Sequence, residues 1–457
     1  MRLTLSDVKQ ALDYGVGPGG DRIVFSGVST DTRTLQPGDL FVALRNREVD
    51  GHQFIPQALR AGAAGLIVSQ SVVASLDTPV LRVPDTEVAY GLLARFWRDK
   101  FDIPVIGVTG SVGKTTVKEM LAAALSPLGL VLKTPASQNN ETGVPKTLLE
   151  LTPEHKAVVV EMGMRGAGQI AYLCGIARPT VGVITVIGDN HLELLGSRQA
   201  IADAKGELFQ SLPEDGVAIL NADDEYYDYL LAKVDQDSVL DMSYGSKPGS
   251  VLCATEIKPK DGGWSVVTRG PYGEESIFAL ASPAKHDVYN ALAALAAACA
   301  AGVSVEEAIT GLQNYSPPPM RMQVTKIPSG VTILNDAYNA APASVASALE
   351  TLTAYAGSRK IAFLGDMREL GEQSTEAHRE LGAVIAGLGG LDALYTVGGL
   401  AAQIPGAAQR FADSGEATRF AREALSPRPG DVILVKGSRA MAMERIVEAL
   451  AAEAPPS

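Results

Sequence analysis

The stretch of residues 103–122, IPVIGVTGSVGKTTVKEMLA, constrains the fold more than any other part of the chain. A run of β-branched residues enters a glycine-rich turn, and Lys114 and Thr115 then open an amphipathic helix. This order predicts a strand, a phosphate-binding loop and a helix whose N-terminal N–H groups surround phosphate oxygens. In such loops the lysine reaches the β- and γ-phosphates and the hydroxyl holds magnesium. We therefore predict a site for a nucleoside triphosphate and Mg²⁺ formed by Thr109, Gly110, Ser111, Val112, Gly113, Lys114, Thr115 and Thr116.

The loop departs from the strict pattern G-x-x-x-x-G-K-[ST] at one position. That pattern needs glycine at position 108, where the chain has Val108. The alternative interpretation is an ordinary glycine-rich turn between a strand and a helix, with a surface lysine. The strand-turn-helix context favours the phosphate-binding loop.

The chain has 457 residues, which is long for one hydrophobic core, and we predict three domains. Alternating strand and helix segments predict the α/β class throughout, with a parallel sheet in the middle of the chain. The proline-rich stretch SPPPMRMQ marks a boundary, and the third part lacks a dinucleotide-binding fingerprint after its first strand. We predict a small mixed α/β domain, a central P-loop domain and a Rossmann-like domain, over residues 1–99, 100–318 and 319–457.

The charge and the cysteines exclude some classes of protein. A net charge of −13 leaves no general basic surface for nucleic acid. Cys174, Cys253 and Cys299 are scattered, which is typical of a reducing compartment. Because the longest apolar stretch, residues 291–303, is too short to span a bilayer, we expect a cytoplasmic protein that does not enter the membrane.

Titratable residues follow the predicted central strands. Glu161 ends one strand and His191 lies shortly after another, so both are expected beside Lys114 at the carboxyl edge of the sheet. A carboxylate there suits Mg²⁺. The position of Lys205 in a helix favours an exposed lysine, and Asn290 lies one turn into an alanine-rich helix, where it could read a base edge.

The N-terminal part carries two polar clusters near predicted strand ends. One contains Ser29, Asp31 and Arg33, and the other contains Asp50 and His52. The spacing alone favours solvated turns. A small-molecule pocket is the alternative.

Motifs along the whole chain resemble those of the Mur ligases. They are TGSVGKTT, NNETGVP, VEMGM, ITVIGDNHLE, ADAKGE, RMQ, NDAYNAAP, GDMRELG and VKGSR, in the order and spacing of that family. The resemblance implies that Lys114 contacts the β- and γ-phosphates, and that Thr115 and Glu161 bind one magnesium ion. It implies a second magnesium ion near His191 and a CO₂-derived carbamate on Lys205.

The same resemblance implies further binding residues. Asn290, Asp336 and Asn339 match adenosine contacts, and Arg321 matches an arginine on the phosphate side. Asn139 and Asn140 match the acceptor side, whereas Ser29, Asp31, Arg33, Asp50 and His52 match the region that holds a uridine-diphosphate sugar. Asp287 replaces the asparagine expected after His286, which makes adenine recognition there less secure.

The implied reaction is an ATP-dependent amide ligation through an acyl phosphate. The N-terminal motifs TDTR, PGDLFVAL and DGHQFI fit the member that joins D-alanyl-D-alanine to UDP-N-acetylmuramoyl-tripeptide, and its diaminopimelate-adding relative. The latter carries a DNPR stretch that is absent here. Two alternatives are a folylpolyglutamate-type ligase, which should lack the N-terminal domain, and a nucleotide-gated binding protein without catalysis. The family also implies a monomer.

Overall fold

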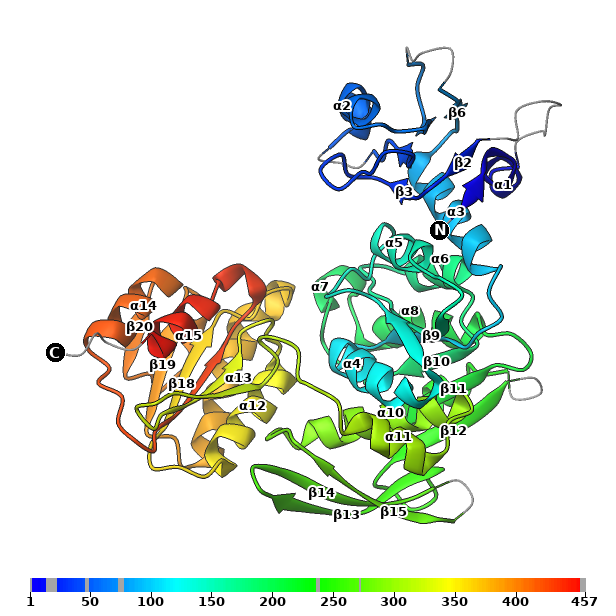
Figure 1. The fold of residues 1–457 in the computed structure, drawn as a ribbon. Helices are drawn as coiled ribbons and strands as arrows, with labels where there is room; N and C mark the ends of the chain where they lie inside the picture. The colour runs from blue at the N-terminus through cyan, green and yellow to red at the C-terminus, as the bar shows by residue number, and fades with distance from the viewer. Residues whose placement is uncertain are drawn as a thin grey trace.

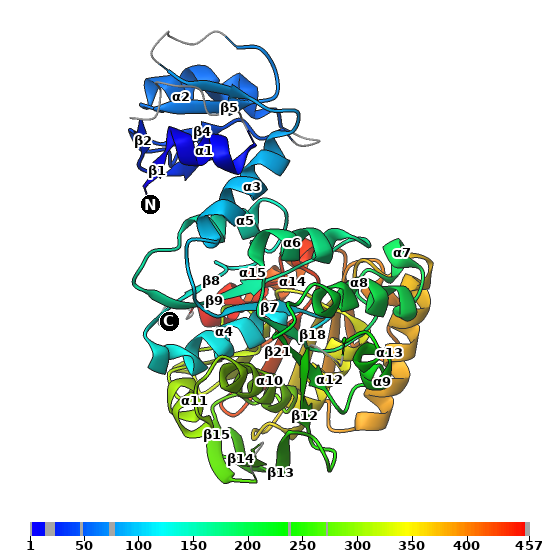
Figure 2. The ribbon, with the colours of Figure 1, turned by 90° about the vertical axis from the view of Figure 1, so that its right-hand side faces the viewer.

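The computed structural model describes residues 2–13, 23–45, 49–72, 78–235, 239–270 and 273–452. Three α/β units follow one another along the chain, and each is built around its own sheet (Figure 1). The N-terminal unit stands above the central unit in both views, and the C-terminal unit lies beside the central unit in Figure 1 and behind it in Figure 2. In the part of the chain that is described, no helix is both long and apolar enough to cross a membrane.

The N-terminal unit has a four-stranded parallel sheet in the order β3-β4-β5-β6 and a small antiparallel pair, β1 and β2. Helix α3 leads out of this unit, and it is capped by Asp85, whose side chain accepts the N–H groups of Glu87 and Val88. The elements are β1 (Leu3–Thr4), α1 (Leu5–Ala11), β2 (Val24–Phe25), β3 (Val28–Ser29), β4 (Leu40–Val42), α2 (Ile55–Arg60), β5 (Gly65–Val68), β6 (Val80–Arg82) and α3 (Thr86–Arg98).

The central unit has a nine-stranded sheet in the order β15-β14-β13-β12-β11-β10-β7-β9-β8. Its strands are β7 (Val105–Thr109), β8 (Leu130–Lys133), β9 (His155–Glu161), β10 (Val181–Ile184), β11 (Val217–Asn221), β12 (Leu240–Gly245), β13 (Leu252–Lys260), β14 (Gly263–Arg269) and β15 (Glu275–Leu280). Its helices are α4 (Lys114–Ala124), α5 (Gly143–Leu149), α6 (Gln169–Ala177), α7 (Leu192–Leu195), α8 (Arg198–Gln210), α9 (Tyr227–Leu231), α10 (His286–Ala300) and α11 (Val305–Leu312).

The predicted parallel sheet is present and continues to β13, which pairs parallel with β12. Strands β14 and β15 then extend it through antiparallel pairing that the sequence analysis did not predict. These strands mix buried and exposed positions, and β15 alternates them along its second half. They therefore lack the continuous apolar run by which the buried parallel strands were recognised.

Strand β7 lies between β9 and β10, and this order positions the phosphate loop. Val108 pairs with Glu161, and Thr109 pairs with Ile184. Because all three strands are parallel, their carboxyl ends meet at one edge of the sheet. The loop after β7, the Glu161 side chain and the segment after β10 therefore share that edge.

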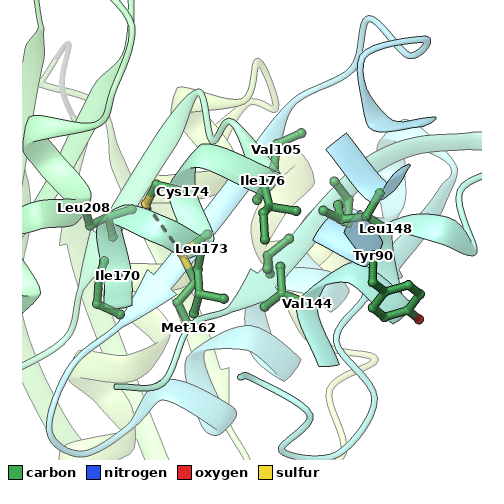
Figure 3. Packing of buried hydrophobic residues seen from close by; sticks show 14 of the residues in the cluster. Tyr90, Val105, Val144, Leu148, Met162, Ile170, Leu173, Cys174, Ile176 and Leu208 are labelled. Carbon is green, nitrogen blue, oxygen red and sulfur yellow. Dashed lines mark hydrogen bonds between the residues drawn. The ribbon is translucent and has the colours of Figure 1, made fainter. Parts of the chain in front are cut away.

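Helix α3 is anchored to the central unit by apolar packing against α5 and α6 (Figure 3). Trp97 donates its indole N–H to the Leu151 carbonyl at 3.0 Å, and Arg98 donates to the Ala177 carbonyl at 2.9 Å. In the same core the Cys174 Sγ atom lies 3.7 Å from Met162 Sδ, and burial raises the pKa of this thiol to about 12. Cys174 is therefore a packing residue.

The C-terminal unit has a six-stranded sheet in the order β16-β17-β21-β18-β19-β20, with β16 antiparallel to β17. The edge strands β16 and β20 are shorter than the four strands between them. The chain enters this unit through Pro317, Pro318 and Pro319, which lie outside any helix or strand. The elements are β16 (Gln323–Lys326), β17 (Thr332–Asp336), α12 (Pro342–Ala354), β18 (Lys360–Gly365), α13 (Ser374–Leu388), β19 (Ala393–Val397), β20 (Gln409–Phe411), α14 (Ser414–Glu423), β21 (Val432–Lys436) and α15 (Glu444–Ala451).

Candidate functional site

The glycines of the phosphate loop stand where a side chain has no room. Gly110 has φ +146°, and a Cβ atom there would lie 1.9 Å from the Thr185 hydroxyl oxygen. Gly113 has φ +89°, and its Cβ would lie 2.6 Å from Asn290 Oδ1. Thr185 also donates to the Val112 carbonyl at 2.5 Å, which holds the loop against the segment after β10. The loop conformation therefore depends on glycine at both positions.

Lys114 and Thr115 open α4 directly after this loop. The Lys114 ammonium donates to the Gly110 carbonyl at 2.7 Å, and burial lowers the pKa of Lys114 while nearby Glu161 opposes that shift. The Thr115 hydroxyl donates to Glu161 Oε1 at 3.3 Å and accepts from the Arg321 guanidinium at 3.2 Å. Thr115 thus joins the central and C-terminal units within the predicted phosphate site.

The Glu161 carboxylate is 1% exposed and is only partly satisfied. Oε1 accepts from Asn139 Nδ2 at 2.7 Å, whereas Oε2 is buried, has no hydrogen-bond donor among the described residues, and has the Lys118 ammonium at the longer distance of 3.5 Å. A buried carboxylate oxygen without a donor suits a hard cation such as Mg²⁺. The described residues contain no group of three or more His, Cys, Asp or Glu side chains that would hold a metal ion by themselves. A magnesium ion here would therefore also need phosphate oxygens.

Lys118 is a residue of this site that the sequence analysis missed. It is fully buried, donates to the carbonyls of Thr134 at 2.8 Å and Ala136 at 2.6 Å, and lies 3.5 Å from Glu161 Oε2. The sequence could have indicated this role through the spacing of the two lysines, because a residue four positions after Lys114 lies on the same face of the helix. Lys118 fixes the carboxylate and the segment that carries Asn139 together.

Lys205 lies on α8 and is 2% exposed, so the expectation of an exposed lysine was wrong. The face of α8 that carries Lys205 packs inward. The position of Lys205 in the sequence did not show which face of the helix would be buried. Burial and the nearby Lys114 charge lower the pKa of Lys205 well below its usual value, and no carboxylate pairs with it among the described residues. A buried amine that is neutral part of the time is what reaction with CO₂ requires. The residue fits a carbamate.

His191 precedes α7 with φ +66°, and its Nδ1 lies 3.4 Å from Glu369 Oε2 of the C-terminal unit. Burial, with the Lys205, Lys114 and Arg165 charges, lowers the pKa of His191 to about 4. The ring is therefore neutral at physiological pH and has a nitrogen lone pair available.

The C-terminal unit supplies one wall of the site. The Arg321 guanidinium stacks 3.9 Å from the centre of the Tyr338 ring, and the Tyr338 hydroxyl donates to Ser137 of the central unit. Lys436 donates to Asp336 Oδ2 at 2.5 Å and to the Asn339 carbonyl at 2.9 Å. The predicted residues of this unit are therefore held by two sets of contacts, one through Tyr338 and one through Lys436.

Asn290 lies beside the phosphate loop, and its side chain is held in place by the nearby Asp287. Asp287 accepts from Asn290 Nδ2 at 2.8 Å and from the Ser282 hydroxyl at 2.5 Å. The departure from the expected asparagine thus provides a carboxylate that orients Asn290. The Asn290 amide oxygen faces Gly113.

A cavity of about 880 Å³ joins these groups. Its walls include a residue of the N-terminal unit, Thr30, together with residues of the other two units. The predicted site residues that line it are Ser111, Val112, Gly113, Lys114, Thr115, Thr116, Asn139, Asn140, Glu161, His191, Asn290, Arg321, Asp336 and Asn339. Thr109, Gly110 and Lys205 do not line it. Thr109 donates its hydroxyl to the Met162 carbonyl, and Gly110 carries the loop.

The N-terminal clusters do not line this cavity. Arg33 is exposed and pairs with Asp31, which lowers the Asp31 pKa to about 2, and Ser29 donates to the Asp31 carbonyl. His52 is buried between the Asp50 carboxylate at 2.6 Å and the Ser69 N–H at 2.9 Å. In the first cluster Arg33 is exposed while Ser29 and Asp31 are half-buried, and in the second cluster His52 is packed into the unit.

Asn139 and Asn140 have different surroundings although both line the cavity. Asn139 binds Glu161, as described above. Asn140 Oδ1 accepts from the Gly143 N–H at 3.0 Å and from the Thr142 hydroxyl at 3.2 Å, so it binds the first residue of α5. The pair links α5 to the Glu161 carboxylate.

Comparison with known proteins agrees with this arrangement of three units around one cavity. The family described as Mur ligase family, catalytic domain, matches residues 24–98, the Mur ligase middle domain matches residues 108–298, and the Mur ligase glutamate ligase domain matches residues 320–439. The chain belongs to the Mur ligase family. This Mur ligase is 38% identical to the UDP-N-acetylmuramoyl-tripeptide--D-alanyl-D-alanine ligase of Synechocystis sp., and the match covers 100% of this chain and 99% of that protein.

Solved structures resemble this Mur ligase over nearly its whole length. A crystal structure of MurF from Acinetobacter baumannii has a TM-score of 0.90 and 32% identity, and the match covers 99% of both chains. The MurF ligase of Thermotoga maritima in complex with ADP has a TM-score of 0.82 and 30% identity, and the match covers 93% of this chain and 97% of that chain. The three-unit α/β fold predicted from the sequence is confirmed.

Proposed function

We propose that this Mur ligase joins D-alanyl-D-alanine to UDP-N-acetylmuramoyl-tripeptide, with ATP converted to ADP and phosphate, as a step of peptidoglycan synthesis. The observation that carries the proposal is the shared cavity: Thr30 of the N-terminal unit, the phosphate loop of the central unit and Arg321 of the C-terminal unit line one space. A ligase of this kind needs a nucleotide-sugar peptide, ATP and an amine within reach of one another. The similarity to D-alanyl-D-alanine ligases of the family over the whole chain supports the choice of substrates.

The chemistry has two steps. The terminal carboxylate of the peptide attacks the γ-phosphorus of ATP, so that ADP leaves and an acyl phosphate forms. The amine of the dipeptide then attacks the acyl carbon, inorganic phosphate leaves, and the amine loses a proton. The first step brings a carboxylate against a triphosphate, so positive groups must offset their repulsion.

In this proposal the chain supplies those groups from two sides. Lys114 contacts the β- and γ-phosphates from the loop, and Arg321 approaches Thr115 from the C-terminal unit. Thr115 and Glu161 would hold one magnesium ion, and His191 with a carbamate on Lys205 would hold a second. Bound magnesium supplies Lewis-acid stabilisation of the charge that develops on the phosphate.

An acyl phosphate hydrolyses in water, so the site has to exclude water. Contacts between the central and C-terminal units across the cavity, Arg321 with Thr115 and Tyr338 with Ser137, provide a means of closing it. Asn290, Asp336 and Asn339 are proposed to contact adenosine, and Asn139 and Asn140 the peptide. Because the proposed substrates are nucleotides of the cell interior, we also propose a cytoplasmic enzyme, acting as a monomer.

An amide-ligation assay tests the proposal. The purified chain is given ATP, Mg²⁺ and UDP-N-acetylmuramoyl-tripeptide with either D-alanine or D-alanyl-D-alanine, and phosphate release and product mass are followed. We expect phosphate release that depends on the dipeptide, with a product heavier by the dipeptide. Phosphate release without either amine, or release that needs glutamate and a folate, would refute the substrate assignment.

A further inference from the structure

The segment that leads from the end of β10 to His191 is joined to the phosphate loop by consecutive hydrogen bonds. The Thr185 hydroxyl donates to the Val112 carbonyl at 2.5 Å. The next residue, Val186, accepts the Ser111 N–H at its carbonyl at 2.8 Å. The start of this segment and the loop therefore have a fixed spacing.

Ser111 makes most of these bonds from the side of the loop. Its hydroxyl donates to the Gly188 carbonyl at 3.2 Å and accepts the Gly188 N–H at 2.9 Å, so the two residues form a reciprocal pair. The residue is 3% exposed. Because its N–H binds Val186, both donors of Ser111 are already used within the protein. Ser111 therefore has no donor left for a phosphate oxygen.

The opposite side of the segment is fixed by residues of the next two strands. Asp224, which follows β11, accepts the Ile187 N–H at 2.9 Å. Tyr244 of β12 is fully buried and donates its hydroxyl to the Thr185 carbonyl at 3.1 Å. The backbone before His191 is thus held between the phosphate loop and the sheet.

The side chain of His191 has less support than the backbone that leads to it. Its Nδ1 is buried and forms no hydrogen bond among the described residues, although Glu369 Oε2 lies 3.4 Å away. The preceding Asn190 also has a buried side-chain oxygen, Oδ1, for which the described residues offer no partner. The position of the His191 ring therefore depends on the backbone that Ser111 and Thr185 hold.

We propose that Ser111 and Thr185 are positioning residues, which set the place of His191 relative to the phosphate loop and leave the phosphate contacts to the loop residues after Ser111. The inference rests on the proposed function, because it concerns how the second magnesium site is brought to the phosphates of ATP. A misplacement of about 1 Å in such a site costs about a hundredfold in rate. Loss of either hydroxyl should therefore slow ligation while ATP still binds.

The test variants are Ser111→Ala and Thr185→Val, which remove one hydroxyl each and change the side-chain volume little. Thr185→Ser keeps the hydroxyl and serves as the conservative variant. Thr268→Val is the matched control, because Thr268 is fully buried in β14, donates to the Ser276 carbonyl at 3.3 Å and does not line the cavity.

We expect both test variants to lower kcat, and to raise the Mg²⁺ concentration for half-maximal ligation, by about ten- to a hundredfold, as loss of a residue that orients a metal ligand does. The ATP dissociation constant, measured by calorimetry at saturating Mg²⁺ without the peptide, should stay within about threefold of the wild type. Thr185→Ser should restore most of kcat, and Thr268→Val should not lower it.

Hydrogen exchange followed by mass spectrometry gives a readout that needs no activity. In the unliganded chain, a peptide that spans residues 186–195 should exchange at least about tenfold faster in Ser111→Ala than in the wild type, because its local opening becomes easier. The same peptide should be unchanged in Thr268→Val. A general loss of stability would instead speed exchange in peptides of α10 as well.

Three results would overturn the inference. They are unchanged exchange of residues 186–195 in Ser111→Ala, an ATP dissociation constant that rises as much as kcat falls, and a Thr185→Ser variant as slow as Thr185→Val. The second result would make Ser111 a phosphate contact. If the wild type joins no dipeptide to the peptide, the proposed function fails, and the exchange measurement still decides whether Ser111 holds the segment before His191.

Discussion

Replacing Lys118 by methionine removes a buried ammonium but keeps the length of the side chain. Two carbonyls, those of Thr134 and Ala136, lose a donor, and the Glu161 carboxylate 3.5 Å away loses its compensating charge. Removing one member of a buried ion pair costs about 3–5 kcal/mol, because the remaining charge stays buried. For a unit of this size we expect the midpoint of thermal unfolding to fall by about 6–20 °C.

The matched control is Lys133→Met. Lys133 binds Glu119, as Lys118 does, but its side chain is 44% exposed, so its loss should cost less than about 1 kcal/mol. Thermal unfolding is followed by circular dichroism for both variants. The double variant Lys118→Met/Glu161→Gln should be less destabilised than the sum of the two single variants, since it removes both charges.

The reasoning would be refuted by Lys118→Met unfolding at the same temperature as Lys133→Met. It would equally be refuted by strict additivity in the double variant, because the energy would then not come from the Lys118 and Glu161 charges. A further expectation is that Lys118→Met requires more Mg²⁺ for half-maximal ligation, as the carboxylate is no longer held in place.

Three other outcomes are expected. Gly110→Ala should weaken ATP binding at least tenfold in calorimetry, because its Cβ would overlap the Thr185 hydroxyl, whereas Gly166→Ala, which meets nothing within 4 Å, should not. After exposure to ¹³C-bicarbonate, the wild type should show a carbamate signal in the ¹³C NMR spectrum that Lys205→Met lacks. Burial lowers the pKa of His378, so folding stability should be full above the unfolded value of about 6.5 and decline as the pH falls below it. The variant His378→Gln should show a smaller decline between pH 7 and pH 5 in urea titrations; an equal decline would assign the pH dependence to other groups.

The sequence was most informative where local chemistry determines structure. The apolar runs before Gly110 and around residues 157–160 gave the strands, and parallel pairing then placed Glu161 and the loop at one edge. The Mur ligase motifs gave the family and its three-unit α/β fold. These features depend on short-range patterns, which one chain displays directly.

Features that depend on how distant segments pack could not be predicted from short-range sequence patterns. The burial of Lys205 depends on which face of α8 meets the sheet, and the role of Lys118 depends on carbonyls that lie 16 and 18 residues further along the chain. The contact between Glu369 and His191 joins residues of different units, so no local pattern indicates it. Asp287 departs from the residue expected at its position, and only the structure explains it: its carboxylate accepts hydrogen bonds from Ser282 and Asn290.

The three consecutive prolines between the central and C-terminal units have a mechanical consequence. Each ring fixes φ and removes an N–H donor, so residues 317–319 cannot coil into a helix and shorten the connection. The C-terminal unit is therefore attached by a strut of nearly constant length. We expect movement that brings Arg321 toward or away from Thr115 to be a swing about the ends of that strut.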